Sequence, residues 1–435
     1  MSDRPPTRGK RLWKLASMSA SVAGDFARTR LRNTFRSQED AEADQRESFR
    51  RSGERIAETL GQLKGAAMKV GQMASVGADL LPRELSDALR VLQREAPPMP
   101  IEVIEEQIER EFGVIPERLF ASFNPEPFAA ASIGQVHRAT TDDGVEVIVK
   151  VQYPGVDDSV DTDLNHLRFA LRASGMVGRH HRDAFDRLFE ELRSKLHEEL
   201  DYTNEAHNLR LLREVHRDDP FVHLPEVIGE RSAKRVLTLS FEDGTPLREV
   251  EDTWPQDLRN TIGANLVRLL ARQIFDARLI HADPNPGNFA FRDDGTIVLY
   301  DYGCVKALDP DTMDAWEHGI RAGLHEDYEA LDEALFRLGA RLPDSPPVDA
   351  DFYRPWRDIM LEPFLGTDYN FGEARLQEKA RKLLPDFFRN IQSFQPPVEL
   401  AFLDRTIGGH YGTLRRLRAT GPWRDIVAPW IDLDA

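Results

Sequence analysis

The sequence predicts an α+β fold, because a short β-rich region lies between longer segments with helical patterning. Two β-rich runs are separated by Asp143-Gly144, a pair typical of a hairpin turn. Apolar residues recur at helical spacing in residues 56–94 before this region and in residues 258–278 after it. With 435 residues and 41% hydrophobic side chains, the chain is long enough to bury a sizeable core in two or three lobes.

Composition argues against several classes of function. The net charge of −17 argues against general nucleic-acid binding, which uses a basic surface to replace counterions. The single cysteine, Cys304, allows neither an intrachain disulfide nor a cysteine-based metal cluster. No run reaches the roughly 18 apolar residues that span a bilayer, and the first residues lack the apolar core of a signal peptide. We therefore expect an intracellular, cytoplasmic protein that does not span a membrane.

Residues 1–36 depart from the acidic average. Leu12, Leu15, Val22 and Phe26 recur there at helical spacing. The basic side chains around them are Arg4, Arg8, Lys10, Arg11, Lys14, Arg28, Arg30, Arg32 and Arg36. The pattern predicts a basic amphipathic helix that lies on an anionic membrane surface, packs on its own protein or frays as a tail. Residues 38–51 are charged and poor in apolar side chains, as in a linker or a solvated helix.

A short polar motif, Lys69-Val70-Gly71-Gln72, interrupts the helical pattern of residues 56–94. Glycine in mid-helix costs about 1 kcal/mol relative to alanine. Its presence indicates close packing or a function, although a string of this length also arises by chance. The prolines of segment 97–100 end this region, and a further helix is expected over residues 101–112, ending at Gly113.

The second strand of the hairpin ends in Val-Ile-Val-Lys at Lys150. Kinases end the equivalent strand in Val-Ala-Ile-Lys, and that lysine binds the α- and β-phosphates of ATP and pairs with a glutamate on the following helix. The place of their glycine-rich phosphate loop is taken here by Ala129-Ala130-Ala131-Ser132. A Cβ at each alanine limits how closely the backbone wraps phosphates, so we expect a nucleotide pose unlike that of a typical protein kinase.

Four acids in the helix predicted over residues 185–212 compete as the partner of Lys150. They are Glu198, Glu199, Asp201 and Glu205. Glu199 and Asp201 are two apart and cannot share a helical face, whereas Asp201 and Glu205 are four apart and can. Because charged runs on helices are mostly solvated, periodicity leaves the choice of partner open.

Two motifs in the second half of the chain predict the chemistry. Asp283 is followed five positions later by Asn288, the spacing of the kinase catalytic loop, in which Asp faces the phosphate acceptor and Asn binds Mg²⁺. Asp301 begins Asp-Tyr-Gly at the end of a β-rich apolar run. Mg²⁺ takes one or two protein carboxylates plus phosphate oxygens, so Asn288 and Asp301 suffice when a nucleotide supplies the rest. Either motif alone fits an ordinary turn, but together they predict a phosphoryl-transfer site.

With these motifs in this order, the chain resembles the AarF/UbiB family of atypical kinases, which includes the ADCK proteins. The matching strings are Lys69-x-Gly71-Gln72, Ala129-Ala130-Ala131-Ser132, Val-Lys-Val-Gln-Tyr-Pro-Gly-Val at residues 149–156, Glu199-x-Asp201 and Asp283-Pro284-Asn285-x-x-Asn288. The resemblance covers most of the chain. It implies a bilobal protein-kinase-like fold: a small β-rich N-lobe with a helical insert, a larger helical C-lobe and an N-terminal helical extension whose Lys-x-Gly-Gln helix covers the cleft where a protein substrate would dock.

The resemblance also implies roles for single residues. Glu205 is the implied partner of Lys150, and both join Asp283 as catalytic residues. The implied nucleotide-binding residues are Lys150, Lys69, Gln72, Ala129, Ala130, Ala131, Ser132, Glu199 and Asp201, with both of these acids facing Lys69 and the nucleotide. The expected division of the chain is a basic tail at 1–50, the helical extension at 51–115, the N-lobe at 116–245 and the C-lobe at 246–435.

Two positions depart from typical protein kinases. Tyr302 stands where Phe is commoner in the metal motif, which keeps the ligand and adds a hydroxyl that needs a partner. Ala282 stands where the catalytic loop usually has Arg, so control by a phosphorylated activation loop is not expected. No Ala-Pro-Glu follows the metal motif, which further disfavours a protein kinase.

The predicted function is that of an ATP- and Mg²⁺-dependent atypical kinase or ATPase that supports ubiquinone or other isoprenoid-lipid biosynthesis. The expected cofactors are ATP or ADP and Mg²⁺. The expected partners are an isoprenoid lipid or lipid-biosynthetic enzymes, with peripheral contact to the inner face of a membrane through the N-terminal helix and no nucleic acid. A small-molecule phosphotransferase of the aminoglycoside or choline kinase type is one alternative, although it would lack the Lys-x-Gly-Gln extension. A non-enzymatic scaffold that binds nucleotide and lipid is the other, although it has no need of Asp283.

Overall fold

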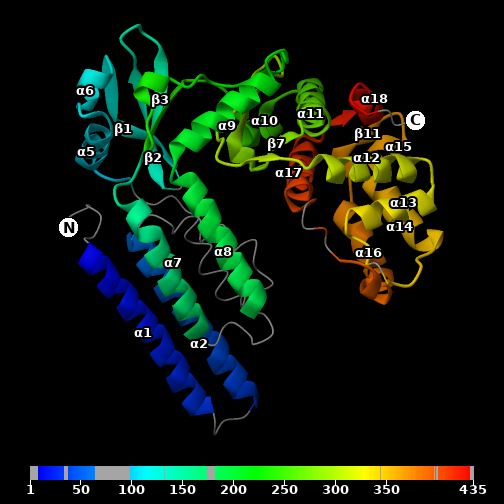
Figure 1. Ribbon diagram of the computed structural model, residues 1–435, viewed down its shortest axis with the longest axis horizontal. Helices are drawn as coiled ribbons and strands as arrows, with labels where there is room; N and C mark the ends of the chain where they lie inside the picture. Colours follow the sequence, from blue (N-terminus) through cyan, green and yellow to red (C-terminus); the bar gives the residue numbers. More distant parts are fainter. Residues whose placement is uncertain are drawn as a thin grey trace. The chain divides into compact units, whose positions relative to one another are not determined.

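The computed structural model describes residues 8–33, 38–63, 98–131, 133–173, 182–342, 344–395, 397 and 400–431. The chain divides into two compact units, and Figure 1 colours the chain along its sequence from blue to red. Unit 1 comprises Met1–Ala206 and Glu226–Phe241, and unit 2 comprises His207–Pro225 and Glu242–Ala435. Both units combine helices with small sheets, in agreement with the predicted α+β class. The predicted four-part division of the chain stays a prediction.

A four-stranded antiparallel sheet forms the β-rich part of unit 1. Its order is β1 (Ser122–Ala131), β2 (Gly134–Thr140), β3 (Glu146–Gln152) and β5 (Val236–Ser240). The predicted hairpin joins β2 to β3, and its turn contains Gly144 at a φ of 84°, a conformation that glycine adopts without strain.

Short helices border this sheet, and one of them was expected from the sequence. The helix α5 (Ile101–Phe112) ends at Gly113 with a φ of 73°, as the sequence predicts. It buries Val103, Ile104 and Ile108 at a spacing of three to four residues, which is the apolar stripe of an amphipathic helix. Two more short helices lie in the described part of unit 1, α6 (Pro116–Leu119) and the 3₁₀ turn η3 (Gly229–Arg231).

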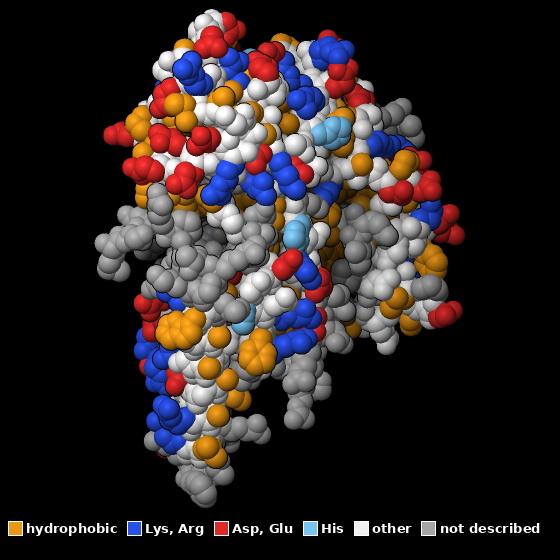
Figure 2. Space-filling model, turned by 60° about the vertical axis from the view of Figure 1, so that its left-hand side comes forward, with side chains coloured by type: hydrophobic (Ala, Val, Ile, Leu, Met, Phe, Trp, Pro, Cys, Tyr) orange, Lys and Arg blue, Asp and Glu red, His pale blue; other side chains and the backbone are white. Residues whose placement is uncertain are grey.

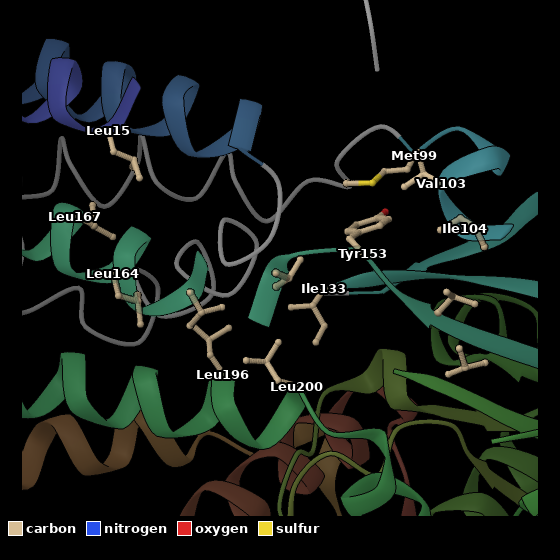
Figure 3. Packing of buried hydrophobic residues seen from close by; sticks show 14 of the residues in the cluster. Leu15, Met99, Val103, Ile104, Ile133, Tyr153, Leu164, Leu167, Leu196 and Leu200 are labelled. Atoms are coloured by element: carbon tan, nitrogen blue, oxygen red, sulfur yellow. The ribbon is translucent and has the colours of Figure 1, made fainter. Parts of the chain in front are cut away.

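Long helices make up much of the described part of unit 1. They are α1 (Arg8–Asn33), α2 (Gln38–Leu63), α7 (Val156–Ala173), α8 (Arg182–Glu199) and the start of α9 (Tyr202–Val215). Leu15, Met18 and Val22 of α1 are at most 2% exposed and belong to one core cluster with Leu164 and Leu167 of α7, as Figure 3 shows for Leu15. Of the three alternatives that the sequence left open for the N-terminal helix, these buried residues agree with the one in which the helix packs on its own protein. Residues 38–51, expected as a linker or a solvated helix, are helical.

The helix predicted over residues 185–212 is wrong as one element, because the chain breaks between α8 and α9. Asp201 is responsible for the break: its carboxylate accepts hydrogen bonds from the Thr203 backbone N at 3.0 Å and from the Thr203 hydroxyl at 2.6 Å. An aspartate that binds the backbone two residues ahead competes with helix continuation and caps a new helix instead. Asp201 and Glu205 therefore do not lie on one continuous helical face.

Unit 2 contains three small sheets. The strands β4 (Val222–His223), β9 (Ile297–Leu299), β8 (Phe289–Phe291) and β6 (Thr245–Pro246) form the first in this order, with β4 parallel to β9. Two-stranded antiparallel sheets pair β7 (Leu279–His281) with β10 (Val305–Ala307) and β11 (Tyr369–Asn370) with β12 (Thr420–Gly421).

The other regular elements described in unit 2 are helices and short helical turns. Its α-helices are the later part of α9, then α10 (Leu247–Thr253), α11 (Gln256–Ala271), α12 (Pro310–Leu324), α13 (Tyr328–Arg337), α14 (Ala350–Met360), α15 (Glu362–Leu365), α16 (Leu376–Arg389), α17 (Ala401–Leu417) and α18 (Trp423–Val427). Its shorter turns are the π-helical η4 (Arg272–Asp276) and the 3₁₀ turns η5 (Pro286–Asn288), η6 (Phe371–Glu373) and η7 (Ile391–Ser393).

Charged side chains of both signs are interspersed on the face drawn in Figure 2. This mixture is unlike the single-sign basic stripe that nucleic-acid binding uses. Within the described ranges, no helix is both long and apolar enough to cross a membrane.

Candidate functional site

Lys150 lies on β3, an inner strand of the sheet in unit 1. Its neighbours Val149 and Val151 are fully buried, and strand alternation places Lys150 on the opposite face from them. The backbone register pairs Lys150 with Val136 of β2 and with Leu237 of β5. Because strands flank it on both sides, this position is held rigidly.

The side chain of Lys150 forms a buried ion pair with Glu205. The two side chains are only 10% and 8% exposed, and the lysine Nζ lies 5.5 Å from the centre of the Tyr202 ring. Two charges removed from water are tolerated when they are paired and hydrogen-bonded to one another. Of the four acids that the sequence offers, the structure brings Glu205 to Lys150, which is the pairing that the resemblance implied.

Local interactions at the break between α8 and α9 place Glu205. Asp201 caps α9, so Glu205 falls in the first turn of that helix. The side chain of Gln152, two residues beyond Lys150, donates a hydrogen bond of 3.1 Å to the Glu199 carbonyl at the end of α8. The strand that carries Lys150 is thus joined to the segment that leads into the Glu205 helix.

The implied contacts of Glu199 and Asp201 with Lys69 lie outside the described residues, because Lys69 and Gln72 do. The Asp201 carboxylate has a structural task as a cap, and Glu199 is half-buried. Their roles toward a nucleotide stay a prediction.

The alanine segment was expected as a loop, and the structure corrects this. Ala129, Ala130 and Ala131 belong to β1 and pair with Val136, Gln135 and Gly134 of β2, respectively. Alanine adopts the extended conformation at a lower entropic cost than glycine does, so the hydrogen-bonded pairing of β1 with β2 continues through this segment. Ser132 lies outside the described residues.

Gly134, which sequence reasoning did not select, is the glycine that this hairpin requires. A Cβ at this position would lie closer than 3.0 Å to the backbone carbonyl of Val151, the residue after Lys150. The close approach of β2 to β3 beside the lysine therefore depends on glycine. The only sequence signal was an isolated glycine at the start of a strand.

Asp283 and Asn288 lie on the loop between β7 and β8 in unit 2. The Asn288 amide nitrogen donates to the Asp283 carboxylate at 2.9 Å and to the Asp283 carbonyl at 3.2 Å. The Asn285 side chain accepts from the Gly287 N at 3.0 Å and begins the 3₁₀ turn η5, which ends at Asn288. The five-residue spacing thus closes into a loop in which Asn288 holds the carboxylate of Asp283.

Asp301 follows β9 and is tied to the same loop. The Tyr300 N donates to the Asn288 carbonyl at 3.0 Å, and His281 Nε2 donates to the Asp301 carbonyl. The Asp301 carboxylate accepts from the Gly303 N at 2.9 Å. The predicted metal ligands Asn288 and Asp301 therefore belong to one hydrogen-bonded segment of unit 2.

The two departures from typical kinases are accommodated in the structure. The hydroxyl of Tyr302, whose side chain is fully buried, donates to the Leu299 carbonyl, so the expected need for a partner is met. Ala282 donates its N to the Cys304 carbonyl at 2.8 Å, and its own carbonyl accepts from Arg405 of α17.

Sequence reasoning missed a series of buried hydrogen bonds that ends at the backbone of His281. Gln273, fully buried in the π-helical η4, accepts from the His281 N at 2.9 Å and donates to His216 Nε2 at 2.9 Å. His216 Nδ1 then donates to the Asp219 carboxylate at 2.8 Å. This series of hydrogen bonds fixes the backbone of His281, two residues before Asp283. No spacing rule relates Gln273 to the loop, because the π-helical turn shifts the helical register by one residue.

The donor set suits a hard cation that also binds phosphate. Among the residues that the structure describes, no group of three or more His, Cys, Asp or Glu side chains forms a self-contained metal site. An amide oxygen from Asn288 and a carboxylate from Asp301 are two oxygen donors, which is the number that Mg²⁺ takes from proteins when a nucleotide completes its shell.

Comparison with known proteins identifies relatives of this chain. The ABC1 atypical kinase-like domain matches residues 91–335. The atypical kinase coq-8, mitochondrial, of Caenorhabditis elegans is 31% identical over 96% of this chain, which spans 56% of that relative's length. The atypical kinase COQ8B, mitochondrial, of Rattus norvegicus is 31% identical over 86% of this chain and 71% of its own length. The atypical kinase COQ8, mitochondrial, of Saccharomyces cerevisiae is 29% identical over 84% and 74%.

A solved structure gives the same result for the fold. Rv3197 from Mycobacterium tuberculosis, determined in complex with erythromycin, superposes with a TM-score of 0.61 at 28% identity, over 86% of this chain and 93% of its own. The predicted kinase-like fold and the family resemblance are confirmed. The chain belongs to the ABC1 atypical kinase-like family.

Proposed function

We propose that this chain is an ATP- and Mg²⁺-dependent atypical kinase or ATPase that supports ubiquinone or other isoprenoid-lipid biosynthesis. The observation that carries the proposal is the hydrogen bond from Asn288 to the Asp283 carboxylate, in a segment also bonded to Asp301. A phosphoryl-transfer loop needs these three oxygen-bearing side chains in one rigid arrangement, because catalysis rests on positioning and on charge stabilisation.

Each predicted residue has a task in this proposal. Lys150 binds the α- and β-phosphates, and Glu205 holds its ammonium group in place through the ion pair. Asn288 and Asp301 bind Mg²⁺, which when present neutralises charge on the phosphate oxygens. Asp283 receives the proton of the acceptor hydroxyl or orients a water molecule, and Asn288 keeps its carboxylate directed.

The lipid part of the proposal is supported by the family. Relatives at about 30% identity are named as COQ8 atypical kinases, and their names place them in mitochondria. We place this chain peripherally at the inner face of a membrane. Because Leu15, Met18 and Val22 of α1 are buried, that contact would use Trp13, which is 71% exposed.

Measured ATP turnover tests the proposal. We compare the wild-type chain with Asp283→Asn and Asp301→Asn, with and without isoprenoid-phenol mimics and anionic liposomes. Asp293→Asn, an exposed acid in the β8–β9 turn, is the matched control. Loss of a positioned proton acceptor costs about 10²–10⁴-fold in rate, so Asp283→Asn falls by at least 100-fold. Asp301→Asn loses a carboxylate ligand of Mg²⁺ and falls as well, while the control stays within about twofold. Turnover that is unchanged in both site variants contradicts the catalytic proposal and favours the nucleotide- and lipid-binding scaffold.

A second measurement separates the remaining alternative. The products formed from labelled ATP in the presence of a lipid extract identify the acceptor. Labelled lipid or free phosphate supports the proposal, whereas transfer to an added aminoglycoside or choline supports a small-molecule phosphotransferase.

A further inference from the structure

The helix α17 contacts the 281–289 loop although it lies far along the chain and beyond the segment matched by the family. Its first contact is Arg405, whose guanidinium donates to the carbonyl of Ala282 and lies 3.6 Å from the Cys304 sulfur. Ala282 immediately precedes Asp283, and Cys304 follows the Asp301-Tyr302-Gly303 motif. One side chain of α17 therefore contacts both segments that carry the predicted catalytic and metal-binding carboxylates.

The second contact is made by Gly409, one helical turn after Arg405. A Cβ at this position would lie closer than 3.0 Å to the ring of Pro284, the residue after Asp283. Real Cβ atoms do not approach so closely, so the helix and the loop can touch here only because residue 409 is glycine. Gly408 and Gly412 on the same helix have no atom within 4 Å of the equivalent position.

The third contact is made by His410, which is 3% exposed. Its ring packs edge-on against Phe289 at a centroid distance of 5.3 Å, and Phe289 packs in turn against His281 at 5.7 Å. Phe289 directly follows Asn288, so the far end of the loop also rests on α17. Burial, together with the nearby His281, lowers the pKa of His410 to about 4, so the ring is neutral where it packs.

We propose that Arg405, Gly409 and His410 form a brace that sets the geometry of Asp283 and Asn288. Arg405 and Gly409, at i and i+4, lie on one face of α17 and contact Ala282 and Pro284, while His410, the next residue, contacts Phe289 at the far end of the loop. Arg405 also brings a guanidinium to Ala282, the position at which this chain lacks the usual catalytic-loop arginine. The three are positioning residues, because they act through Ala282, Pro284 and Phe289. The inference rests on the proposed function for its catalytic consequence and on the contacts alone for its structural part.

Three glycine-to-alanine changes on the one helix test the brace. Each adds the same methyl group at a helical position, but only Gly409→Ala forces Pro284 to move. A displacement of about 1 Å at a reacting group costs up to 10²-fold in rate. We expect Gly409→Ala to lower kcat for ATP turnover by 10-fold or more, with KM for ATP and the melting temperature little changed. Gly408→Ala and Gly412→Ala keep the wild-type kcat. An unchanged kcat in Gly409→Ala, or equal losses in all three variants, would overturn the proposal.

Substitutions of Arg405 test its contact independently. We expect Arg405→Met to lower kcat by 10-fold or more, while Arg405→Lys recovers part of the loss because one donor to the Ala282 carbonyl is kept. If Arg405 served only to stabilise the fold, Arg405→Met would lower the melting temperature in step with kcat. A positioning role instead lowers kcat while KM for ATP and the melting temperature stay near the wild-type values. Full activity in Arg405→Met would remove Arg405 from the brace.

Hydrogen exchange of the 281–289 peptide separates this inference from the proposed function, because it needs no turnover. We expect exchange to be about tenfold faster in Gly409→Ala and Arg405→Met than in the wild type, and unchanged in Gly408→Ala and in the peptide that contains β3. Unaltered exchange at 281–289 would refute the brace even if ATP turnover exists, and faster exchange would support it even if ATP turnover were absent.

Discussion

Replacing Lys150 with methionine should destabilise unit 1 through the charge that it leaves behind. The Glu205 side chain is 8% exposed and would lose the ammonium group with which it forms its buried ion pair. Breaking a buried pair in this way costs about 3–5 kcal/mol. At about 1.36 kcal/mol per factor of ten, the equilibrium constant for opening rises by roughly 10²–10⁴-fold. The double variant Lys150→Met with Glu205→Leu buries no charge, so we expect it to lose less stability than either single change.

Native-state hydrogen exchange of the β3 amides measures this free energy for unit 1 separately from unit 2. Arg50→Gln on α2 is the control, because Arg50 and Glu54 are 51% and 55% exposed and an exposed pair contributes about 1 kcal/mol or less. The reasoning is refuted if Lys150→Met costs under 1 kcal/mol, or if the double variant loses as much as the two single changes added together.

Two further predictions concern a helix cap and an acid-sensitive group. Asp201→Ala should lower the opening free energy of the α9 amides by about 1 kcal/mol, whereas Asp201→Asn keeps the cap and this free energy. Hydrogen exchange measures both, and an equal decrease in the two variants would show that Asp201 does not act as a cap. The pKa of His410 is lowered to about 4 mainly by burial, so the unfolded chain binds a proton below pH about 6.5 that the folded chain refuses until pH about 4. Stability is therefore retained above pH 6.5 and falls by about 3 kcal/mol from this group as the pH drops to 4. Urea denaturation measures the free energy of unfolding across this pH range, and we expect its fall on acidification to be about 3 kcal/mol smaller in His410→Leu than in the wild type. An identical fall in both proteins would contradict this prediction.

Local patterns predicted the elements whose conformation is set by neighbouring residues. The hairpin at Asp143-Gly144 and the end of α5 at Gly113 were correct, because a left-handed turn residue is visible in the sequence itself. The grouping of Asp283, Asn288 and Asp301 was also predictable, because two short strands and a tight loop bring residues of small sequence separation together.

Other features depended on interactions that periodicity does not record. The break at Asp201 arises from a side chain that binds its own backbone, and the alanine segment became a strand because β2 offered it a full ladder. The apolar stripe of α1 predicts burial without naming the partner, and α7 rather than a lipid surface covers it.

The sequence by itself predicted the chemistry that we propose for this protein, from the residue types and spacings of an atypical kinase down to the departures at Ala282 and Tyr302. Only the tertiary structure decided which acid pairs with Lys150 and which helix holds the loop of Asp283. The physical reason is distance along the chain. Glu205 reaches Lys150 across 55 positions, and Arg405 reaches Ala282 across 123. Contacts of such separation are set by how whole elements pack, which no local pattern encodes.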